Sequence, residues 1–498
     1  MTASDPQSRK MTEMYFPDVF QVESVTPALK KEKGFTRYDE LIGFMTEIQK
    51  MNPGLVELRY LGVSHQGKRI PWVRIGKRVR DTSVSAEKPI EVWMQGGLHG
   101  DEPASTEGLL YLIYQCVKSW DSLPYMHNLT LNVVPMVNPD GFEIQERENA
   151  QGLDLNRDQT KLLASESIPL KQAMAEVRPD VAVDFHEYRP FRRDYVHMGS
   201  FGVCGAYDVM FLNSNHPNIP QAWIELRKDH FEKPVREVLD RNSITHHDYF
   251  TPEKSDGKTV FRIGSDNPRS SSSNFSLQGI IATLVEVRGV GLGRTSFRRR
   301  IYTTYLVAQT YLEQASKAAP ILRAHKMNRF VPDSLSIRSK RTQRPDSLLF
   351  LDIDNNQPIR LGVWLDDARL QQVLQKRKCP VAYAIPFQQS EIISRLHAFG
   401  LQGDTLPAGS RLKVETYQTG DVSYDPVPYE KVKLIHLTVQ TKQSYITTTE
   451  PLIQFSMTQA GALIMPELLE PDASGSLFHF SVVDVKPHAQ LPLFRVVQ

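Results

Sequence analysis

The chain has 498 residues, of which 40% are hydrophobic and 23% are charged. This composition excludes a wholly disordered, collagen-like or coiled-coil protein, and the length predicts two or three domains that each bury a core. Lysine and arginine total 59 and aspartate and glutamate total 57, a net charge of +2. No overall field therefore indicates a nucleic acid or an acidic membrane as a partner.

The first predicted elements follow a lead-in. We expect a loosely structured segment over residues 1–34. Apolar residues at helical spacing then predict a helix from Tyr38. The predicted strands after it cover residues 56–64, 70–76, 90–95, 129–137, 180–185 and 280–287. The predicted helices cover residues 103–117, 167–177, 220–241 and 301–318. Apolar strands separated by helices indicate an α/β domain, with a mixed, mostly parallel sheet flanked by helices.

A change in composition follows the last of these helices. Residues 336–347 are polar and basic with no apolar period, so we interpret 326–347 as a linker or exposed loop; a nucleic-acid patch is the less favoured alternative. Short strands follow, predicted at 347–353, 380–386, 411–417, 433–439 and 477–483, with a helix at 389–399. We therefore expect an α/β domain over residues 35–325 and a second, smaller β-rich domain over residues 348–498.

Neither cysteine spacing nor hydropathy indicates a disulfide framework or a membrane protein. Cys116, Cys204 and Cys379 are far apart, as expected of core thiols. The longest nearly apolar run, residues 109–117, is far shorter than the roughly 20 residues that cross a bilayer, so we expect no membrane span. The polar N-terminus lacks the apolar stretch of a signal peptide. Either the protein is cytoplasmic or a leader has been removed.

Candidate metal ligands follow the predicted strand 90–95. His99 and Glu102 lie three residues apart in GGLHGDEPAS, in a loop that leaves the sheet edge where α/β proteins bind ligands. Both side chains could turn toward one cation. The alternative is that Glu102 is an acidic residue near a helix N-terminus, where the helix dipole favours it.

A second imidazole follows the buried strand DVAVDF. His186 also emerges at a strand end, although a lone buried histidine is more often a hydrogen-bonded core residue. Pro190 excludes the HExxH zinc helix that His186 and the next residue would begin. Two histidines and one glutamate, with an open fourth position, form the ligand pattern of a catalytic zinc site.

The segment VNPDGFEIQERENAQGLDLNRDQ gathers polar groups that suit a peptide substrate. Arg147 and Arg157 could hold a carboxylate or stabilise an oxyanion, because guanidinium groups serve both purposes. Asp154 could orient a zinc-bound imidazole through its second ring nitrogen, and Asn156 lies beside it. A turn followed by a solvated, charged helix start is an equally good interpretation.

Glu286 interrupts the apolar strand 280–287 in the sequence LVEVRG. An unpaired carboxylate at such a position is costly, so it needs a partner or a chemical role. The residues leave two interpretations open. One is a structural ion pair with Arg288 on the same strand face, and the other is a general base that takes a proton from zinc-bound water.

As a set, these motifs resemble the zinc carboxypeptidase family, the metallocarboxypeptidases related to carboxypeptidases A and B. The resemblance covers roughly residues 35–320 and rests on H-G-D-E, N-P-D-G-F, R-E-N-x-x-G-x-D-L-N-R, a histidine after a strand, and E-V-R-G. It implies the zinc carboxypeptidase-like fold and one Zn²⁺ per chain, held by His99, Glu102 and His186.

The same resemblance implies roles for further residues. Glu286 matches the catalytic glutamate and Arg147 the oxyanion-stabilising arginine. Asn156 and Arg157 match the pair that holds the substrate's terminal carboxylate, and Asp154 matches the partner of the first ligand. The C-terminal segments PVAYAIPFQQSEIISRLHAFG and AGALIMPELLEPDASGSLFHF are similar to the tail of a bacterial branch of these peptidases. Members of that branch are usually exported, which favours an extracytoplasmic location.

One segment departs from the family pattern. The family usually places a flexible tyrosine shortly before the catalytic glutamate, but RIGSDNPRSSSSNFSLQG contains none, and the nearest upstream is Tyr249. This segment should line the pocket for the terminal side chain. Its serines, Asn274 and Arg269 predict a polar pocket for an acidic or modified group, with Arg269 binding substrate. A loop without such a role is the alternative.

The sequence therefore predicts a zinc-dependent metallocarboxypeptidase. It would hydrolyse C-terminal peptide bonds through a zinc-bound water and a glutamate general base, on a peptide or peptide-like substrate with a free carboxylate. One alternative is a zinc amidase or deacylase that acts on cell-wall peptides or acylated amino acids. Another is a binding protein with a vestigial metal site. Against it, every residue that the chemistry requires is present in the sequence, including Glu286.

Overall fold

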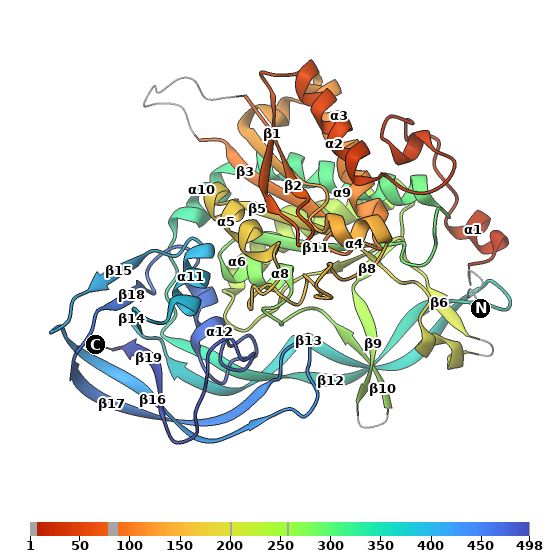
Figure 1. Ribbon diagram of the computed structural model, residues 1–498. Helices are drawn as coiled ribbons and strands as arrows, with labels where there is room; N and C mark the ends of the chain where they lie inside the picture. The colour runs from red at the N-terminus through yellow and green to blue at the C-terminus, as the bar shows by residue number, and fades with distance from the viewer. Residues whose placement is uncertain (1–6, 78–87, 200–201, 256–257, 498) are drawn as a thin grey trace.

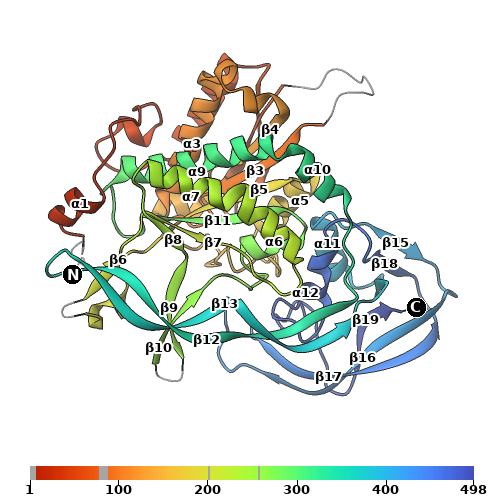
Figure 2. The same ribbon diagram turned by 180° about the vertical axis from the view of Figure 1, so that it is seen from behind.

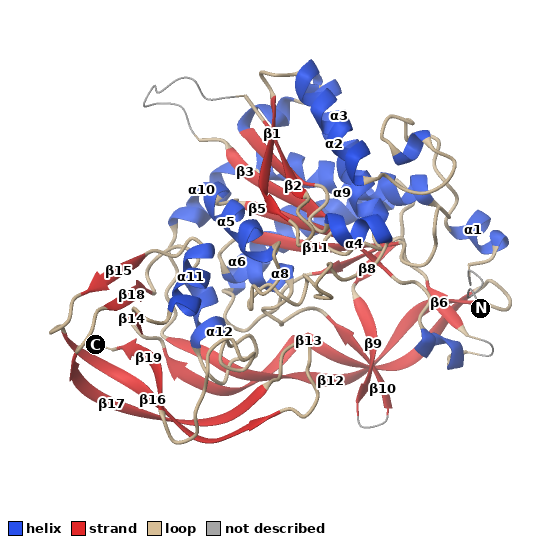
Figure 3. Ribbon diagram, viewed as in Figure 1, coloured by secondary structure: helices blue, strands red, loops and turns tan. Residues whose placement is uncertain are grey.

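The computed structural model describes residues 7–77, 88–199, 202–255 and 258–497. Figure 1 shows an α/β part, formed by the N-terminal portion of the chain, above β-sheets formed mainly by the C-terminal portion. Figure 3 shows the same division, with most helices in the upper part and long strands in the lower part.

Within the described residues, an eight-stranded mixed sheet forms the centre of the α/β part, in the order β1-β2-β4-β3-β5-β11-β7-β8. Its strands are β1 (Val56–Val63), β2 (Arg69–Ile75), β3 (Ile90–Gly96), β4 (Leu129–Val134), β5 (Val181–Tyr188), β7 (Val209–Leu212), β8 (His246–Asp248) and β11 (Ile281–Arg288). The central strands β4, β3, β5 and β11 are parallel, whereas β2 and β7 join them antiparallel. The predicted mixed sheet is confirmed.

Helices cover both faces of this sheet. They are α2 (Tyr38–Met51), α3 (Pro103–Lys118), α4 (Pro139–Ile144), α5 (Ser167–Val177), α6 (Gln221–Arg227), α7 (Lys233–Arg241), α8 (Ser271–Leu277), α9 (Phe297–Lys317) and α10 (Ala319–Met327). In Figure 2, α7, α9 and α10 lie in front of the sheet. Val92 and Met94 of β3 join the apolar cluster that includes α3 and α9, while Trp93 joins the cluster that includes α5. The alternation along one strand thus fills a core on each face.

Two further sheets complete the described structure. The first has the order β6-β12-β13-β10-β9, with β6 (Val203–Gly205), β12 (Ser334–Asp352), β13 (Pro358–Lys378), β10 (Lys258–Ile263) and β9 (Phe250–Ser255). The second has the order β15-β18-β14-β19-β16-β17, with β15 (Gly403–Leu406), β18 (Leu452–Ser456), β14 (Ala382–Pro386), β19 (Gln490–Val496), β16 (Arg411–Tyr424) and β17 (Ile435–Thr447). Helices α11 (Ser390–Ala398) and α12 (Met465–Leu469) accompany the second sheet.

The interpretation of residues 336–347 as a linker or exposed loop was wrong. They form most of β12, which pairs antiparallel with β13 and with β6. Most of this stretch is exposed or half-buried, so its strand carries no apolar period that the sequence could reveal. Because β6 and β10 precede the hairpin in the α/β part, this sheet takes strands from both predicted domains. The boundaries 35–325 and 348–498 therefore stay a proposal.

Two other expectations were wrong. The described part of the lead-in is ordered: it contains α1 (Arg9–Tyr15), and Met11, Phe16 and Val22 are buried. The segment 477–483, expected as a strand, forms turns whose Leu477 and Phe478 are fully buried. An apolar run alone does not distinguish a strand from another buried conformation.

The structure also bears on the cysteines and on membrane spans. Cys116 and Cys204 are buried, Cys379 is half-buried, and none of these three described cysteines forms a disulfide bond. Among the helices of the described ranges, none has the length and apolar character needed to span a bilayer.

Gly100 brings its loop close to α4 and to the residues that follow this helix, at the edge of the central sheet. A Cβ atom on Gly100 would lie 2.1 Å from the carbonyl carbon of Gly141 and 2.4 Å from the carbonyl oxygen of Glu146. Backbone atoms cannot yield as a flexible side chain can, so only glycine allows this approach. The contact fixes the H-G-D-E loop against the N-P-D-G-F segment, which begins α4.

We predict that Gly100→Ala lowers the free energy of unfolding by about 1–3 kcal/mol, the range for overpacking at a close contact. Gly43→Ala is the matched control, because Gly43 lies inside α2 with nothing within 4 Å of the added Cβ. The control should be neutral or stabilising by up to about 1 kcal/mol. Denaturant unfolding of both variants checks this, and an equal effect in the two would contradict it.

Candidate active site

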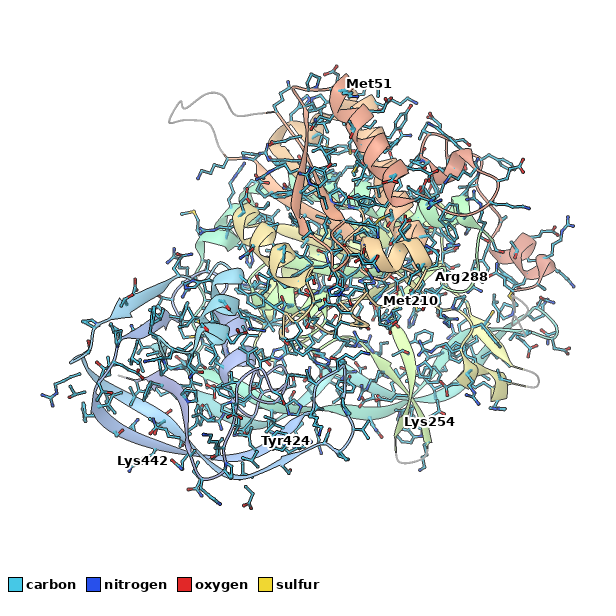
Figure 4. The ribbon with its side chains drawn as sticks, viewed as in Figure 1. Met51, Met210, Lys254, Arg288, Tyr424 and Lys442 are labelled. Carbon is cyan, nitrogen blue, oxygen red and sulfur yellow. The ribbon has the colours of Figure 1, made fainter. Side chains whose placement is uncertain are left out.

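The candidate site lies where the parallel strands β3, β5 and β11 end. His99 follows β3 and Glu102 is the N-cap residue of α3, while His186 and Glu286 stand opposite each other in the parallel register of β5 and β11. Carboxyl ends of parallel strands meet at one edge of a sheet, which is where α/β proteins form their sites. Met210, the partner of Glu286 on β7, is labelled near the middle of Figure 4.

Three side chains converge at this edge. His99 Nδ1 lies 2.7 Å from Glu102 Oε1 and 3.1 Å from His186 Nδ1, and His186 Nδ1 lies 2.9 Å from Glu102 Oε2. All three residues are buried, with at most 2% of each exposed. Glu102 makes no capping hydrogen bond to α3, so its carboxylate serves the two imidazoles and not the helix N-terminus. These residues form a group that could hold a metal ion.

The donor chemistry of this group fits a metal cation. His99 Nε2 lies 3.1 Å from Asp154 Oδ1, and His186 Nε2 lies 2.9 Å from Asp184 Oδ2. Since a carboxylate accepts hydrogen bonds, each Nε2 donates its proton to its aspartate, which leaves each Nδ1 to bind either a second proton or a metal cation. The two Nδ1 atoms and the Glu102 carboxylate therefore meet around positive charge, which is carried by protons on the imidazoles or by a metal cation. Two nitrogens and one oxygen are a donor set of catalytic zinc sites.

The pKa shifts of Glu102, His99 and His186 reflect the charges that these residues place on one another. Burial alone would raise the pKa of Glu102, but His99 and His186 hold it far below its ordinary value. Burial likewise opposes charge on the imidazoles, yet the neighbouring carboxylates raise the pKa of His99, and that of His186 by more. The centre of the site thus favours positive charge.

Arg147 lies on one side of the three converging residues. Its Nε and Nη2 donate to Asp154 Oδ2 at 3.1 and 2.9 Å, and its Nη1 lies 3.1 Å from His99 Nδ1 and 3.6 Å from Glu102 Oε1. Burial lowers the pKa of Arg147, but Asp154 and Glu102 raise it by more, so the guanidinium stays charged. Asp154 therefore orients both the imidazole of His99 and the guanidinium of Arg147, which reaches the three converging side chains.

Glu286 faces the site as the one residue of β11 that is not fully buried. Burial raises the pKa of its carboxyl to about 7; His186 and His99 oppose this rise and Glu102 adds to it. The alternative of an ion pair with Arg288 was wrong. That guanidinium donates to Gln7 Oε1 at 2.8 Å, to the carbonyl oxygen of Gly205 and to the Tyr188 hydroxyl at 3.3 Å.

Asn156 and Arg157 lie just beyond Asp154 in the same loop. Asn156 is buried, and its Oδ1 accepts a hydrogen bond of 2.9 Å from the backbone N–H of Ser271, the first residue of α8. Arg157 is half-buried, and its Nη1 donates to the carbonyl oxygen of Asn156 at 2.9 Å. The loop and the N-terminal end of α8 thus place an amide and a guanidinium next to the converging residues.

The segment before Glu286 differs from its sequence interpretation. The serine-rich run is not a loop but the short helix α8, whose residues are all buried. Arg269 precedes it, and its Nη1 donates to both carboxylate oxygens of Glu430, at 2.6 and 2.7 Å. Tyr249 lies between β8 and β9. The pKa of its phenol is raised to about 12, mainly by burial and next by the negative charge of Glu286. Tyr249 therefore lies close enough to the candidate base to be affected by its charge.

Two residues at the site were not predicted from the sequence. Asp184 binds the second nitrogen of His186, and Ser271 donates its hydroxyl hydrogen to the same carboxylate. Asp184 had a local signal, because it lies two residues before His186 in one strand and so shares its face. Ser271 had none, since its partners lie far away in the sequence.

Comparison with known proteins identifies a domain of known type in this chain. Residues 41–183 match the family model described as zinc carboxypeptidase, and this range includes His99, Glu102, Arg147 and the loop after it. A protein named Carboxypeptidase 2 from Trichophyton equinum is 25% identical over 489 residues, which are 93% of this chain and 87% of that protein. Residues 41–183 therefore contain a zinc carboxypeptidase domain. The chain is a metallocarboxypeptidase, and thus a hydrolase of peptides.

Other relatives of this zinc carboxypeptidase are more distant. An inactive metallocarboxypeptidase ecm14 from Talaromyces stipitatus is 29% identical over 109 residues, 21% of this chain and 18% of that protein. The crystal structure of a metallo-carboxypeptidase from Burkholderia cenocepacia is similar with a TM-score of 0.43 and 17% identity, over 57% of this chain and 70% of that one. The Carboxypeptidase 2 relative is fungal, and the bacterial branch and the extracytoplasmic location stay predictions.

We predict that Asp184→Asn weakens zinc binding to the purified zinc carboxypeptidase by about 10- to 100-fold, because the carboxylate that orients a ligand imidazole is lost. Asp180→Asn is the control: this buried aspartate adjoins the same strand but pairs with Lys326 and the backbone of Glu91. Competition against a fluorescent chelator measures both affinities. Equal affinities in Asp184→Asn and Asp180→Asn would show that the hydrogen bond does not support the metal site.

Proposed function

We propose that this metallocarboxypeptidase hydrolyses the C-terminal peptide bond of a substrate with a free carboxylate, using one zinc ion per chain. The observation that carries the proposal is the parallel register of His186 and Glu286, which sets a carboxylate beside the group formed by His99, Glu102 and His186. A binding protein would not need this carboxylate. Its presence therefore favours catalysis over binding alone.

His99 Nδ1, His186 Nδ1 and Glu102 would hold the zinc ion. When bound, zinc polarises the scissile carbonyl and makes a water molecule easier to deprotonate. Glu286 takes a proton from the attacking water and later returns it to the nitrogen of the leaving amine. Glu286 is only partly buried, whereas its neighbours on β11 are buried, as a group that exchanges protons with substrate must be.

The polar residues of the loop after Arg147 would bind the substrate. The Nη1 atom of Arg147, next to the metal-holding atoms, stabilises the oxyanion that forms when the carbonyl is attacked. Asn156 and Arg157 hold the terminal carboxylate through an amide N–H and a guanidinium. Binding at both groups fixes the last peptide bond between them, so that only the terminal residue is released.

We predict that Glu286→Gln retains zinc and loses at least about 100-fold in kcat, the smallest contribution typical of a general base. Glutamine keeps the size of the side chain but cannot take up the proton. Elemental analysis of the purified variant measures its zinc, and release of the terminal amino acid measures kcat. Wild-type kcat in a zinc-loaded variant would remove Glu286 from the mechanism.

We further predict that the wild-type enzyme cleaves a peptide with a free C-terminus and not the same peptide with a C-terminal amide. Arg157→Met should raise KM for the free peptide by about 10-fold or more, since it removes a charge-assisted contact to the carboxylate. Mass spectrometry of the products distinguishes the two substrates. Equal cleavage of both would instead favour an amidase or deacylase, tested next on cell-wall peptides and acylated amino acids.

A further inference from the structure

A tight turn between β16 and β17 reaches from the C-terminal sheet to the catalytic part. Tyr429 and Val432 form an antiparallel bridge, with backbone hydrogen bonds of 2.8 and 3.0 Å, and we refer to residues 429–432 as the 429–432 turn. Its two central residues, Glu430 and Lys431, have φ values of 50° and 68°. Two successive left-handed residues that are not glycine are unfavourable unless the surroundings hold them. In Figure 4, Tyr424 at the end of β16 lies closer to the middle of the molecule than Lys442 on the outer part of β17.

The side chain of Glu430 holds this turn against two cations of the catalytic part. Its carboxylate accepts hydrogen bonds from Arg269 Nη1 at 2.6 and 2.7 Å and from Lys161 Nζ. Lys161 is 1% exposed, and the side chains of Arg269 and Glu430 are 10% and 13% exposed. The ring of Phe480 lies 4.9 Å from both cations. Buried ion pairs of this kind depend strongly on geometry, because each charge has lost its water.

Lys161 and Arg269 are both connected to Asn156 and Arg157, the residues proposed to hold the substrate carboxylate. The Nζ of Lys161 donates to the backbone carbonyl of Arg157 at 2.8 Å as well as to Glu430. Arg269 lies two residues before Ser271, whose N–H holds the side chain of Asn156. The Glu430 carboxylate therefore connects to Arg157 through Lys161 and to Asn156 through the segment from Arg269 to Ser271.

A second contact places the same turn over the loop that carries the site. A Cβ atom on Gly152 would lie 3.1 Å from the Cε and Nζ atoms of Lys431. Gly152 is part of the segment between Arg147 and Asp154. The 429–432 turn thus packs on this segment as well as on Lys161 and Arg269, so that a shift of the turn would move the backbone around the carboxylate-binding pair.

We propose that Glu430 is a positioning residue of this enzyme, which fixes Asn156 and Arg157 through Lys161 and Arg269 and thereby sets the affinity for the substrate's terminal carboxylate. The inference rests on the proposed function, in which Asn156 and Arg157 hold that carboxylate. It gives the C-terminal sheet a part in substrate binding. Glu430 itself touches neither the substrate nor the reacting atoms.

The test compares Glu430→Gln with Glu415→Gln in steady-state hydrolysis of one peptide with a free C-terminus. Glu415 is the matched control, because it also pairs with a buried arginine, Arg495, but does so within the C-terminal sheet. We expect Glu430→Gln to raise KM by about 10-fold with kcat within about twofold of wild type, since sub-ångström shifts of a substrate-holding group are costly. Glu415→Gln should leave both constants unchanged.

Two further variants separate positioning from a merely structural role. Glu430→Asp keeps the charge and should give a KM between those of wild type and Glu430→Gln. Lys161→Met should raise KM on its own and, combined with Glu430→Gln, add less than the product of the two effects, because both act through one contact. If Glu430→Gln does not fold, Glu430→Asp gives the result by itself.

The outcomes distinguish the inference from the proposed function. An unchanged KM in folded Glu430→Gln or Glu430→Asp, with a wild-type enzyme that requires the free carboxylate, overturns the role of Glu430 alone. Equal losses of kcat and melting temperature in Glu430→Gln and Glu415→Gln also overturn it, because they indicate general destabilisation. A wild-type enzyme that cleaves the amidated peptide equally well contradicts the proposed function instead.

Discussion

Two carboxylates, one buried and one half-buried, determine how the candidate metal site is built. Asp154 and Asp184 bind the Nε2 atoms of His99 and His186, and so turn both Nδ1 lone pairs toward Glu102. Without these partners the imidazole rings could rotate or change tautomer, and the three donor atoms would lose their common centre. The negative charge gathered there is balanced by protons on the two imidazoles, which hold the pKa of Glu102 low, or by a bound cation.

The sheet supplies the other constraint. His186 and Glu286 stand side by side because β5 and β11 are parallel and in register, and His99 follows β3 on the other side of β5. These strands are buried on both faces, so their backbones have little freedom to move. A rigid set of strand ends thus fixes the metal-holding atoms and the candidate base, while the loop after Arg147 brings the groups proposed for the substrate.

The sequence predicts this centre better than its surroundings for a physical reason. Apolar strands are readable from hydropathy, and a histidine or glutamate at the end of one interrupts the pattern, as His186 and Glu286 do. The strand β12 is polar at its exposed positions, so its sequence resembles that of a linker. The buried serines of α8 bond to residues such as Asp184 and Asn156, far away in the chain, so their run resembles a loop. The contact of Glu430 with Lys161 spans 269 positions and leaves no local pattern at all.

The most direct measurement of the central claim is a crystal structure of the zinc-loaded protein with anomalous data on both sides of the zinc absorption edge. The account predicts one anomalous peak per chain, in contact with the Nδ1 atoms of His99 and His186 and with the Glu102 carboxylate, with Asp154 and Asp184 still on the Nε2 atoms. A chain without that peak, or a zinc ion bound through Nε2 or at other residues, would contradict it.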